Sequence, residues 1–117
     1  MSNLLTGDFP TKTYRNINLG VTGVVIKAAK GQIFGGILCN NASAARFVKL
    51  YDKVTAPTTS DTPTQTIELQ ANQTLPLQVG QGIEYLLGIG IRASNLVADN
   101  DNTAPSTNDV VVNIFWL

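Results

Sequence analysis

Few residues in this chain have the chemistry that catalysis needs. The sequence contains no histidine and a single cysteine, Cys39. Histidine is the usual acid or base near neutral pH, the usual activator of serine and cysteine nucleophiles, and a common zinc ligand. Two carboxylates can cleave a glycosidic bond, but Glu68 and Glu84 fall on different expected strands and in no recognisable catalytic setting. We therefore predict no catalytic residue and no enzymatic activity.

Two further patterns suggest cofactor or metal binding but lack the surroundings that these sites require. Residues 88–93, Gly-Ile-Gly-Ile-Arg-Ala, match a dinucleotide fingerprint, which must open a helix, and the polar stretch that follows is too short for one. Asp and Asn alternate over residues 99–102 and offer oxygen ligands suited to calcium. An EF-hand loop would need glycine and glutamate where Ala104 and Val110 stand. We expect a solvated turn there, and no cofactor or metal.

Aromatic side chains offer another possibility, because carbohydrate-binding β-sandwiches stack sugar rings on them. The candidates for such a platform are Phe34, Phe47, Tyr51, Tyr85 and Trp116. Core packing explains most of them, so only an exposed cluster would favour sugar binding. By the same reasoning, we expect Cys39 to be a small buried hydrophobic residue rather than a reactive thiol.

Composition and charge narrow the class of protein and its partners. The 117 residues contain eight basic and eight acidic side chains, 44% apolar residues and 14% charged residues. Such a chain is expected to fold as one domain with one core. Without a basic excess, we expect no nucleic-acid partner. No run approaches the roughly 20 apolar residues that span a bilayer, and the first residues lack a secretion signal, so we expect no membrane partner and residence in a cytosol.

The spacing of apolar residues predicts β-strands from residue 14 onward, because short alternating runs are separated by Gly, Asn, Thr and Pro. The expected strands are residues 15–21, 24–26, 33–39, 46–53, 67–71, 75–79, 83–91 and 109–117. The apolar run 33–39 predicts a strand buried on both faces, with a bulge at Gly35-Gly36. In the run 83–91, glycines on one face leave room for a neighbouring segment.

About eight strands at this spacing predict an all-β fold, a single-domain antiparallel β-sandwich that is jelly-roll-like and spans residues 14–117. The apolar C-terminal segment is expected to be clamped between neighbouring strands. Residues 1–13 form an N-terminal arm in this interpretation. The apolar residues of this arm, Leu4, Leu5 and Phe9, follow no clear period, so it lies either on another subunit or on its own domain.

Three stretches carry a resemblance: residues 48–58 (Val-Lys-Leu-Tyr-Asp-Lys-Val-Thr-Ala-Pro-Thr), the step Thr62-Pro63 ahead of residues 66–69, and residues 98–103 leading to residues 109–113. Together they resemble small structural proteins of tailed bacteriophages, and among these the capsid decoration or cement proteins. The likeness covers roughly residues 45–117. It implies a protein that binds the outside of an icosahedral shell, often as a trimer, and holds the shell together against internal pressure.

The resemblance implies the major capsid protein as partner, a homotrimer, no small-molecule substrate, and a place on the capsid surface of a virion assembled in the host cytoplasm. We expect the contacts to be made by both ends of the chain: Leu4, Leu5, Phe9, Phe115, Trp116 and Leu117. Loops 55–65 and 95–108 are the next choice. Two alternatives remain open: the trimeric head domain of a tail fibre or spike that binds a host receptor, and a carbohydrate-binding β-sandwich module.

Overall fold

The computed structural model describes residues 10–117, in which the chain forms eight strands and no helix. In chain order they are β2 (Lys12–Asn16), β3 (Val24–Lys27), β4 (Gly31–Asn40), β5 (Arg46–Asp52), β6 (Gln65–Leu69), β7 (Thr74–Tyr85), β8 (Ile89–Ser94) and β9 (Val110–Trp116). Lys12 and Thr13 already belong to β2, so the sheet begins inside the stretch expected to be an arm. Within residues 10–117 there is no helix with the length and hydropathy needed to cross a membrane.

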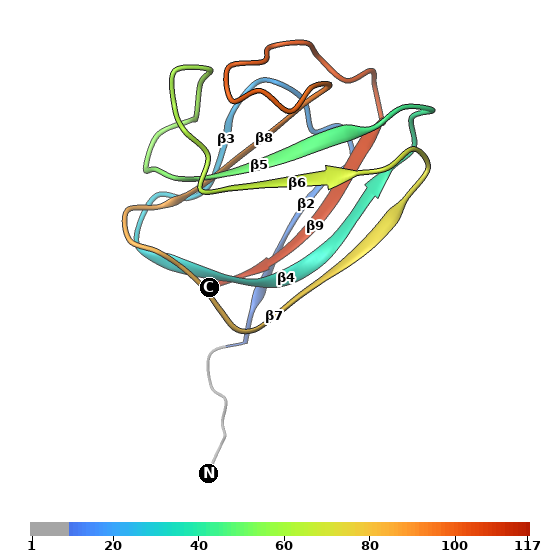
Figure 1. Cartoon of the computed structure of the whole chain (residues 1–117). Helices are drawn as coiled ribbons and strands as arrows, with labels where there is room; N and C mark the ends of the chain where they lie inside the picture. The colour runs from blue at the N-terminus through green and yellow to red at the C-terminus, as the bar shows by residue number, and fades with distance from the viewer. Residues whose placement is uncertain (1–9) are drawn as a thin grey trace.

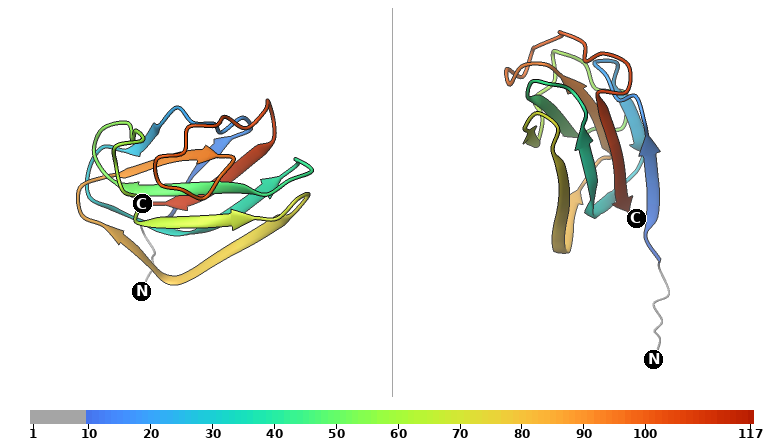
Figure 2. Two further views of the ribbon diagram at one scale, coloured as in Figure 1. Left: turned by 45° about the horizontal axis from the view of Figure 1, so that its top comes forward. Right: turned by 90° about the vertical axis from the view of Figure 1, so that its right-hand side faces the viewer.

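The strands pair in a nested, antiparallel pattern. β5 pairs with β6, β4 with β7, β3 with β8, and β2 with β9, so the chain runs as one long folded hairpin. This hairpin wraps so that β4 also pairs with β9 and β5 with β8. Two four-stranded sheets result, ordered β2-β9-β4-β7 and β3-β8-β5-β6 (Figure 1, Figure 2). This arrangement confirms the predicted jelly-roll-like β-sandwich.

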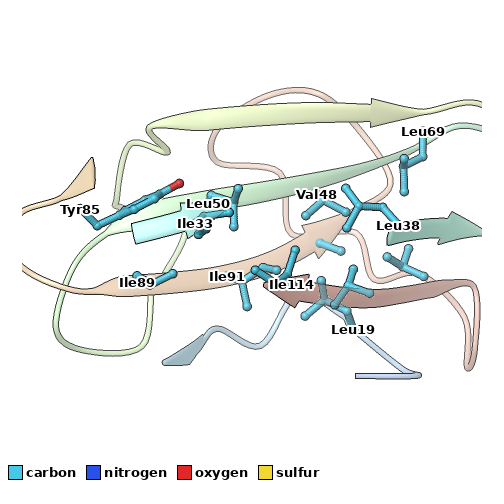
Figure 3. Packing of buried hydrophobic residues seen from close by; sticks show 13 residues of the cluster. Leu19, Ile33, Leu38, Val48, Leu50, Leu69, Tyr85, Ile89, Ile91 and Ile114 are labelled. Atoms are coloured by element: carbon cyan, nitrogen blue, oxygen red, sulfur yellow. The ribbon is translucent and has the colours of Figure 1, made fainter. Parts of the chain in front are cut away.

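The core lies between the two sheets, where alternate residues of each strand meet (Figure 3). On β8 the inward residues are Ile89, Ile91 and Ala93, and on β5 they are Val48 and Leu50, all nearly inaccessible to solvent. Burying each of the larger side chains contributes roughly 1.5–3 kcal/mol. The remaining members of the buried cluster are Leu19, Ile33, Leu38, Leu69, Tyr85, Val110, Val112 and Ile114.

The C-terminal strand β9 lies inside its sheet, between β2 and β4, so the prediction that it is clamped by neighbours is confirmed. β4 also carries the predicted bulge, because its register with both neighbours shifts between Ile33 and Gly35. Gly35 has φ of 138°, a backbone conformation that residues with a side chain rarely adopt. The glycine interruption in the sequence therefore marks the bend of this strand.

The prediction that β4 is buried on both faces is wrong. Ile33 and Leu38 face the core, but Ile37 on the opposite side is 42% exposed and Cys39 is only half-buried. The apolar run suggested full burial because sequence alone does not reveal whether a loop covers the outer face of a sheet.

The predicted strand 15–21 is also wrong, because β2 ends at Asn16 and the chain then crosses from one sheet to the other. The backbone N–H of Leu19 donates to Val110 O (3.1 Å) in the first sheet, and Gly20 O accepts from the N–H of Ala93 (2.8 Å) in the second. Asn16 helps to end β2, since its Oδ1 accepts from the N–H of Asn18 (2.8 Å), a turn-forming bond.

The expected long strand 83–91 is likewise two strands. Ile83 and Tyr85 end β7 in one sheet, and Ile89 begins β8 in the other. The three residues between them, Leu86, Leu87 and Gly88, form the crossing. The glycines of this region do leave room for neighbours: a Cβ atom at Gly90 would lie 3.0 Å from Cδ of Pro57 in the β5–β6 loop.

Candidate interaction surfaces

The groups considered for catalysis are engaged in separate contacts. Glu84 on β7 forms an ion pair with Lys30 (3.4 Å), and Glu68 on β6 accepts a bond from Nε2 of Gln70 (2.9 Å). Both carboxylates are exposed, on strands of different sheets. In the described part of the chain, no group of three or more His, Cys, Asp or Glu side chains is placed to hold a metal ion.

The Asp- and Asn-rich loop uses its oxygens to fold itself. Oδ2 of Asp101 accepts from the N–H of Leu96 (3.0 Å) and from Oγ1 of Thr103 (2.6 Å). These bonds hold the pKa of Asp101 below its ordinary value, although burial alone acts in the opposite direction. The backbone carbonyls of Asp99 and Asp101 both accept from Nη2 of Arg92, each at 3.0 Å. The loop is thus tied to the sheet beneath it.

The aromatic residues considered for sugar binding are covered rather than displayed. Tyr51 and Tyr85 are buried, and Phe34, Phe47 and Trp116 are half-buried. Trp116 packs against the core cluster, and the ammonium groups of Lys12 and Lys27 lie 5.5 and 5.9 Å from its ring centre. No aromatic side chain among residues 10–117 is fully exposed, so the described part of the chain has no open platform for a sugar.

The outer face of the sheet β3-β8-β5-β6 is covered by the β5–β6 and β8–β9 loops, and we call it the sealed face (Figure 1). It buries two cations, Lys49 and Arg92, which are opposite each other on β5 and β8 and have no exposed surface. Nζ of Lys49 donates to the carbonyls of Leu96 (3.3 Å) and Ala98 (2.5 Å). Nε of Arg92 donates to the hydroxyl of Tyr51 (2.8 Å).

The pKa directions on the sealed face reflect this burial. Burial lowers the pKa of Lys49, and the nearby Arg92 charge lowers it further, whereas Asp101 and Asp99 raise it. Burial also raises the pKa of the Tyr51 hydroxyl, against the effect of the Arg92 bond. Buried cations are costly unless their donors find acceptors. Here the acceptors are mostly loop carbonyls, so the two cations fasten the loop over the sheet.

A turn between β7 and β8 displays two leucines, and we call residues 86–88 the leucine turn. Leu86 is 61% exposed and Leu87 is 60% exposed. The turn lies at the left-hand end of the sandwich in Figure 1. Val54, which follows the strand β5, is 46% exposed, and the N–H of Lys53 donates to Gly88 O (3.2 Å). These contacts bring Val54 to the same end of the molecule as the leucines.

The backbone of the leucine turn is held by the carboxylate of Asp52. Its oxygens accept from the N–H groups of Leu86 (3.0 Å), Leu87 (2.8 Å) and Gly88 (3.3 Å). Partial burial tends to raise the pKa of Asp52, but the three amide bonds outweigh it and the pKa is lowered. Because the backbone is fixed, binding would have to order only the side chains of the two leucines and not the turn itself.

No loop of residues 10–117 covers the outer face of the other sheet, β2-β9-β4-β7, and we call it the open face. Its five outward apolar residues are Ile37 and Cys39 on β4, Pro76 on β7, and Val111 and Phe115 on β9. The polar Asn113 lies among them, opposite Ile37 and between Val111 and Phe115. Strand register places these side chains together, because Cys39 is opposite Val111, Ile37 is opposite Pro76, and Phe115 is opposite Gly35. None of the five is buried. Cys39, expected to be buried, is therefore half-buried on an accessible surface.

The residues predicted to make contacts are in different places. Phe115 belongs to the open face, whereas Trp116 packs on the core and Leu117 is half-buried, its backbone bonded to Gln32 (3.0 and 2.9 Å). Leu4, Leu5 and Phe9 lie outside the described residues. The predicted contact loops 55–65 and 95–108 lie over the sealed face, with Leu96 58% and Val97 61% exposed.

The sequence reasoning missed Leu86 and Leu87 as surface residues. Two adjacent leucines break the strict alternation of the run 83–91, and the following Gly88 allows a turn. That signal was available, but Asp52, which fixes the turn, is 34 residues upstream.

Comparison with family models, curated proteins and solved structures gave no match to this chain. The resemblance to capsid decoration proteins therefore remains a hypothesis based on the sequence.

Proposed function

We propose that this protein is a capsid decoration protein, which binds the outer surface of a phage head through the leucine turn and stabilises the shell by adhesion. The partner in this proposal is the major capsid protein, and it comes from the sequence resemblance of residues 45–117. What supports a binding surface in the described structure is the exposed leucine turn. A jelly-roll sandwich is compatible with this role but is shared by many functions.

The observation that carries the proposal is the rigid display of Leu86 and Leu87. Each side chain is about 60% exposed on a turn whose three N–H groups are bonded to Asp52. Burying a leucine contributes roughly 1.5–3 kcal/mol, and preorganisation reduces the entropy lost on binding. Such a contact is weak in one copy and strong when several linked copies bind one lattice.

Adhesion alone is sufficient to stabilise a shell. A protein that binds the assembled shell, but not the dissociated capsomers, shifts the equilibrium toward the assembled state by mass action. Because each bound copy contacts neighbouring subunits of the lattice in this proposal, loss of a capsomer would require those contacts to break. No chemical step is needed.

The test uses the full-length protein mixed with undecorated phage heads, with binding measured by co-sedimentation and stability by heat release of DNA. The double variant Leu86→Ser/Leu87→Ser is expected to bind about 30- to 100-fold more weakly, since it removes roughly 2–3 kcal/mol of apolar burial. The control is Ile17→Ser, which removes an exposed apolar side chain at the crossing after β2, outside the leucine turn and the predicted contact loops. Heads that bind both variants equally well, or do not bind the wild type, would contradict the proposal.

A further inference from the structure

Two adjoining hollows beside the crossing from β2 to β3 are lined by uncharged residues, and together we call them the neutral groove. We propose that the neutral groove binds an uncharged oligosaccharide, whose hydroxyls bond to the amide and hydroxyl side chains of the groove. The proposal does not rest on the function proposed above, because the neutral groove and the leucine turn are separate surfaces.

The first hollow lies between the β2–β3 crossing and the β8–β9 loop. It has a volume of about 340 Å³, and its walls include residues 18–22 and Pro105. The second hollow has a volume of about 370 Å³ and lies between the same crossing and the β5–β6 loop, with Thr59 in its wall. Val21 and Thr22 line both hollows, so the two adjoin. Each volume is in the range of small-molecule sites, roughly 300–1,000 Å³.

The lining of the neutral groove selects against charged ligands. Of the described residues that line either hollow, none is charged and none is aromatic. Another hollow, at the start of β4, is different, since its walls include Lys27, Lys30 and Glu84. A charged ligand in the neutral groove would lose bound water without gaining a countercharge. An uncharged ligand is therefore favoured.

The side chains of the groove match the hydroxyls of a sugar. Asn18, Thr22 and Thr107 line the first hollow and are exposed. Amide and hydroxyl side chains both donate and accept hydrogen bonds, as each sugar hydroxyl does. The apolar lining residues, among them Leu19 and Pro105, are aliphatic and can contact the C–H groups of a sugar ring. This site differs from the aromatic platform considered above, and it implies weak binding by each copy.

The walls of the first hollow are fixed to each other before any ligand binds. Oδ1 of Asn18 accepts from the N–H of Asn108 (3.0 Å), and Nδ2 of Asn108 donates to Ile17 O (2.9 Å). The crossing is also bonded to both sheets, through Leu19 and Gly20. The bond to Asn108 uses the carbonyl oxygen of the Asn18 amide, so its NH₂ group remains a donor. Binding therefore does not have to order the backbone of the groove.

The neutral groove and the leucine turn are at opposite ends of β8. Residues 86–88 lead into β8 at Ile89, whereas the carbonyl of Gly20 in the groove accepts from the N–H of Ala93 (2.8 Å). The strand from residue 89 to residue 93 spans roughly 13 Å. A copy bound through the leucine turn therefore leaves the groove accessible. Many copies on one surface would strengthen a sugar contact that is weak in each copy.

Gly20 allows the groove to be filled without disturbing the packing. Apart from its chain neighbours, a Cβ atom at Gly20 would meet no atom within 4 Å, and the same holds for Gly80 on β7, outside the groove. Gly20→Leu is expected to abolish sugar binding, and the matched control Gly80→Leu to retain it. Thr22→Val removes the hydroxyl but keeps the volume of the side chain. It is expected to raise the dissociation constant about 3- to 10-fold, as loss of one hydrogen bond does.

Binding is measured from amide NMR spectra of the isotope-labelled full-length protein, titrated with the neutral disaccharides maltose, cellobiose, lactose and mannobiose. At least one of them is expected to give saturable shifts at residues 17–23 and 102–107 but not at residues 86–88. Digalacturonate, a charged disaccharide, is expected to give none.

Three results would overturn the proposal: no saturable shift with any of the four neutral disaccharides, wild-type affinity in both Gly20→Leu and Thr22→Val, or stronger binding of digalacturonate or of an uncharged blocked tripeptide of alanine. No phage head is used, so the proposed function can stand when this proposal fails, and the reverse also holds.

Discussion

Tyr85 buries a hydroxyl in the core, and this one group links the stability of the fold to alkaline pH. Its side chain has no exposed surface, and its hydroxyl donates to Oε1 of Gln65. Burial raises the pKa of Tyr85 to about 12. The folded state therefore favours the protonated tyrosine. In the unfolded chain this tyrosine titrates near its ordinary pKa of 10.0, so its contribution to the free energy of unfolding is fully present below pH 10. It is lost progressively as the pH rises from 10 towards 12.

The variant Tyr85→Phe should separate this effect from other alkaline titrations. At pH 7 it is expected to be about 1 kcal/mol less stable, because the bond to Gln65 is lost. As the pH approaches 12 the wild type should lose roughly 2–3 kcal/mol that the variant keeps, so the order of stabilities reverses. Urea titrations at pH 7, 9 and 11.5 measure this. The control is Tyr14→Phe, at a half-buried tyrosine. If wild type and Tyr85→Phe lost stability equally at high pH, the alkaline loss of stability could not be attributed to Tyr85.

The leucine turn depends on a strand that is distant in sequence, since Asp52 at the end of β5 holds the backbone between β7 and β8. In the variant Asp52→Asn, one acceptor oxygen becomes a donor amide and the charge is lost. We expect the free energy of unfolding to fall by about 1–2 kcal/mol, in the range for hydrogen bonds to a charged group. Hydrogen exchange at residues 86–88 should be faster. Asp99→Asn is the control, an exposed carboxylate expected to change stability by less than about 0.5 kcal/mol.

The pH dependence of the same turn has the opposite sign to that of Tyr85. The pKa of Asp52 is lower in the folded state than its ordinary value of 3.8. Its contribution to stability is therefore present above pH 3.8 and is lost as the pH falls through the folded-state pKa. Wild type and Asp52→Asn should become progressively more alike in stability as the pH falls below 3.8. A stability difference that stays constant down to pH 2 would show that the charge of Asp52 is not what holds the turn.

Strands could be predicted from the sequence where one face is buried and the other is solvated, but their ends could not be predicted where the chain changes sheets. β6 and the first half of β7 show the expected alternation, with Leu69 buried and Thr74, Pro76 and Gln78 exposed. From Ile83 to Ile91 the odd-numbered residues stay apolar through the turn, and only Leu86 and Gly88 depart from the pattern. These two residues allow a turn but do not show that the chain changes sheets there. The spacing of apolar residues reflects only the local repeat of a strand, whereas the point at which the chain passes from one sheet to the other depends on contacts with strands distant in sequence.

The candidate surfaces were only partly predictable for a similar reason. Phe115 was expected at a contact surface from its place in the apolar C-terminal run. The structure places it half-buried on the open face, and its role in a contact stays a prediction. The burial of Lys49 and Arg92 could not be foreseen, because charged residues in a strand normally mark a solvated face. Their burial depends on residues 95–101 folding back over the sheet, and short-range sequence patterns contain no information about that loop.

The molecule as a whole is asymmetric, because its long loops all lie on one side. Residues 53–64 and 95–109 both leave strands of the sheet β3-β8-β5-β6 and lie over its outer face, which adds a third layer on that side (Figure 1). The connections that leave the open face uncovered are shorter: residues 41–45 between β4 and β5, and 70–73 between β6 and β7. One outer face is thus sealed by the chain itself, whereas no loop of residues 10–117 covers the other.

If Arg92 fastens the third layer, its replacement should open a loop rather than unfold the sandwich. Arg92→Met keeps most of the volume of the side chain but loses the bonds to Tyr51 and to the carbonyls of Asp99 and Asp101. We expect the free energy of unfolding to fall by only about 1–2 kcal/mol, because the cost of burying a cation is also removed and the released carbonyls can bind water. Hydrogen exchange should accelerate at Asn95 and Asp101, whose N–H groups are bonded inside the loop, while β4 and β9 stay protected. The control Arg15→Met, at an exposed arginine of β2, should leave the free energy of unfolding and the exchange rates of the loop unchanged. A uniform loss of protection across both sheets would show that Arg92 supports the core instead.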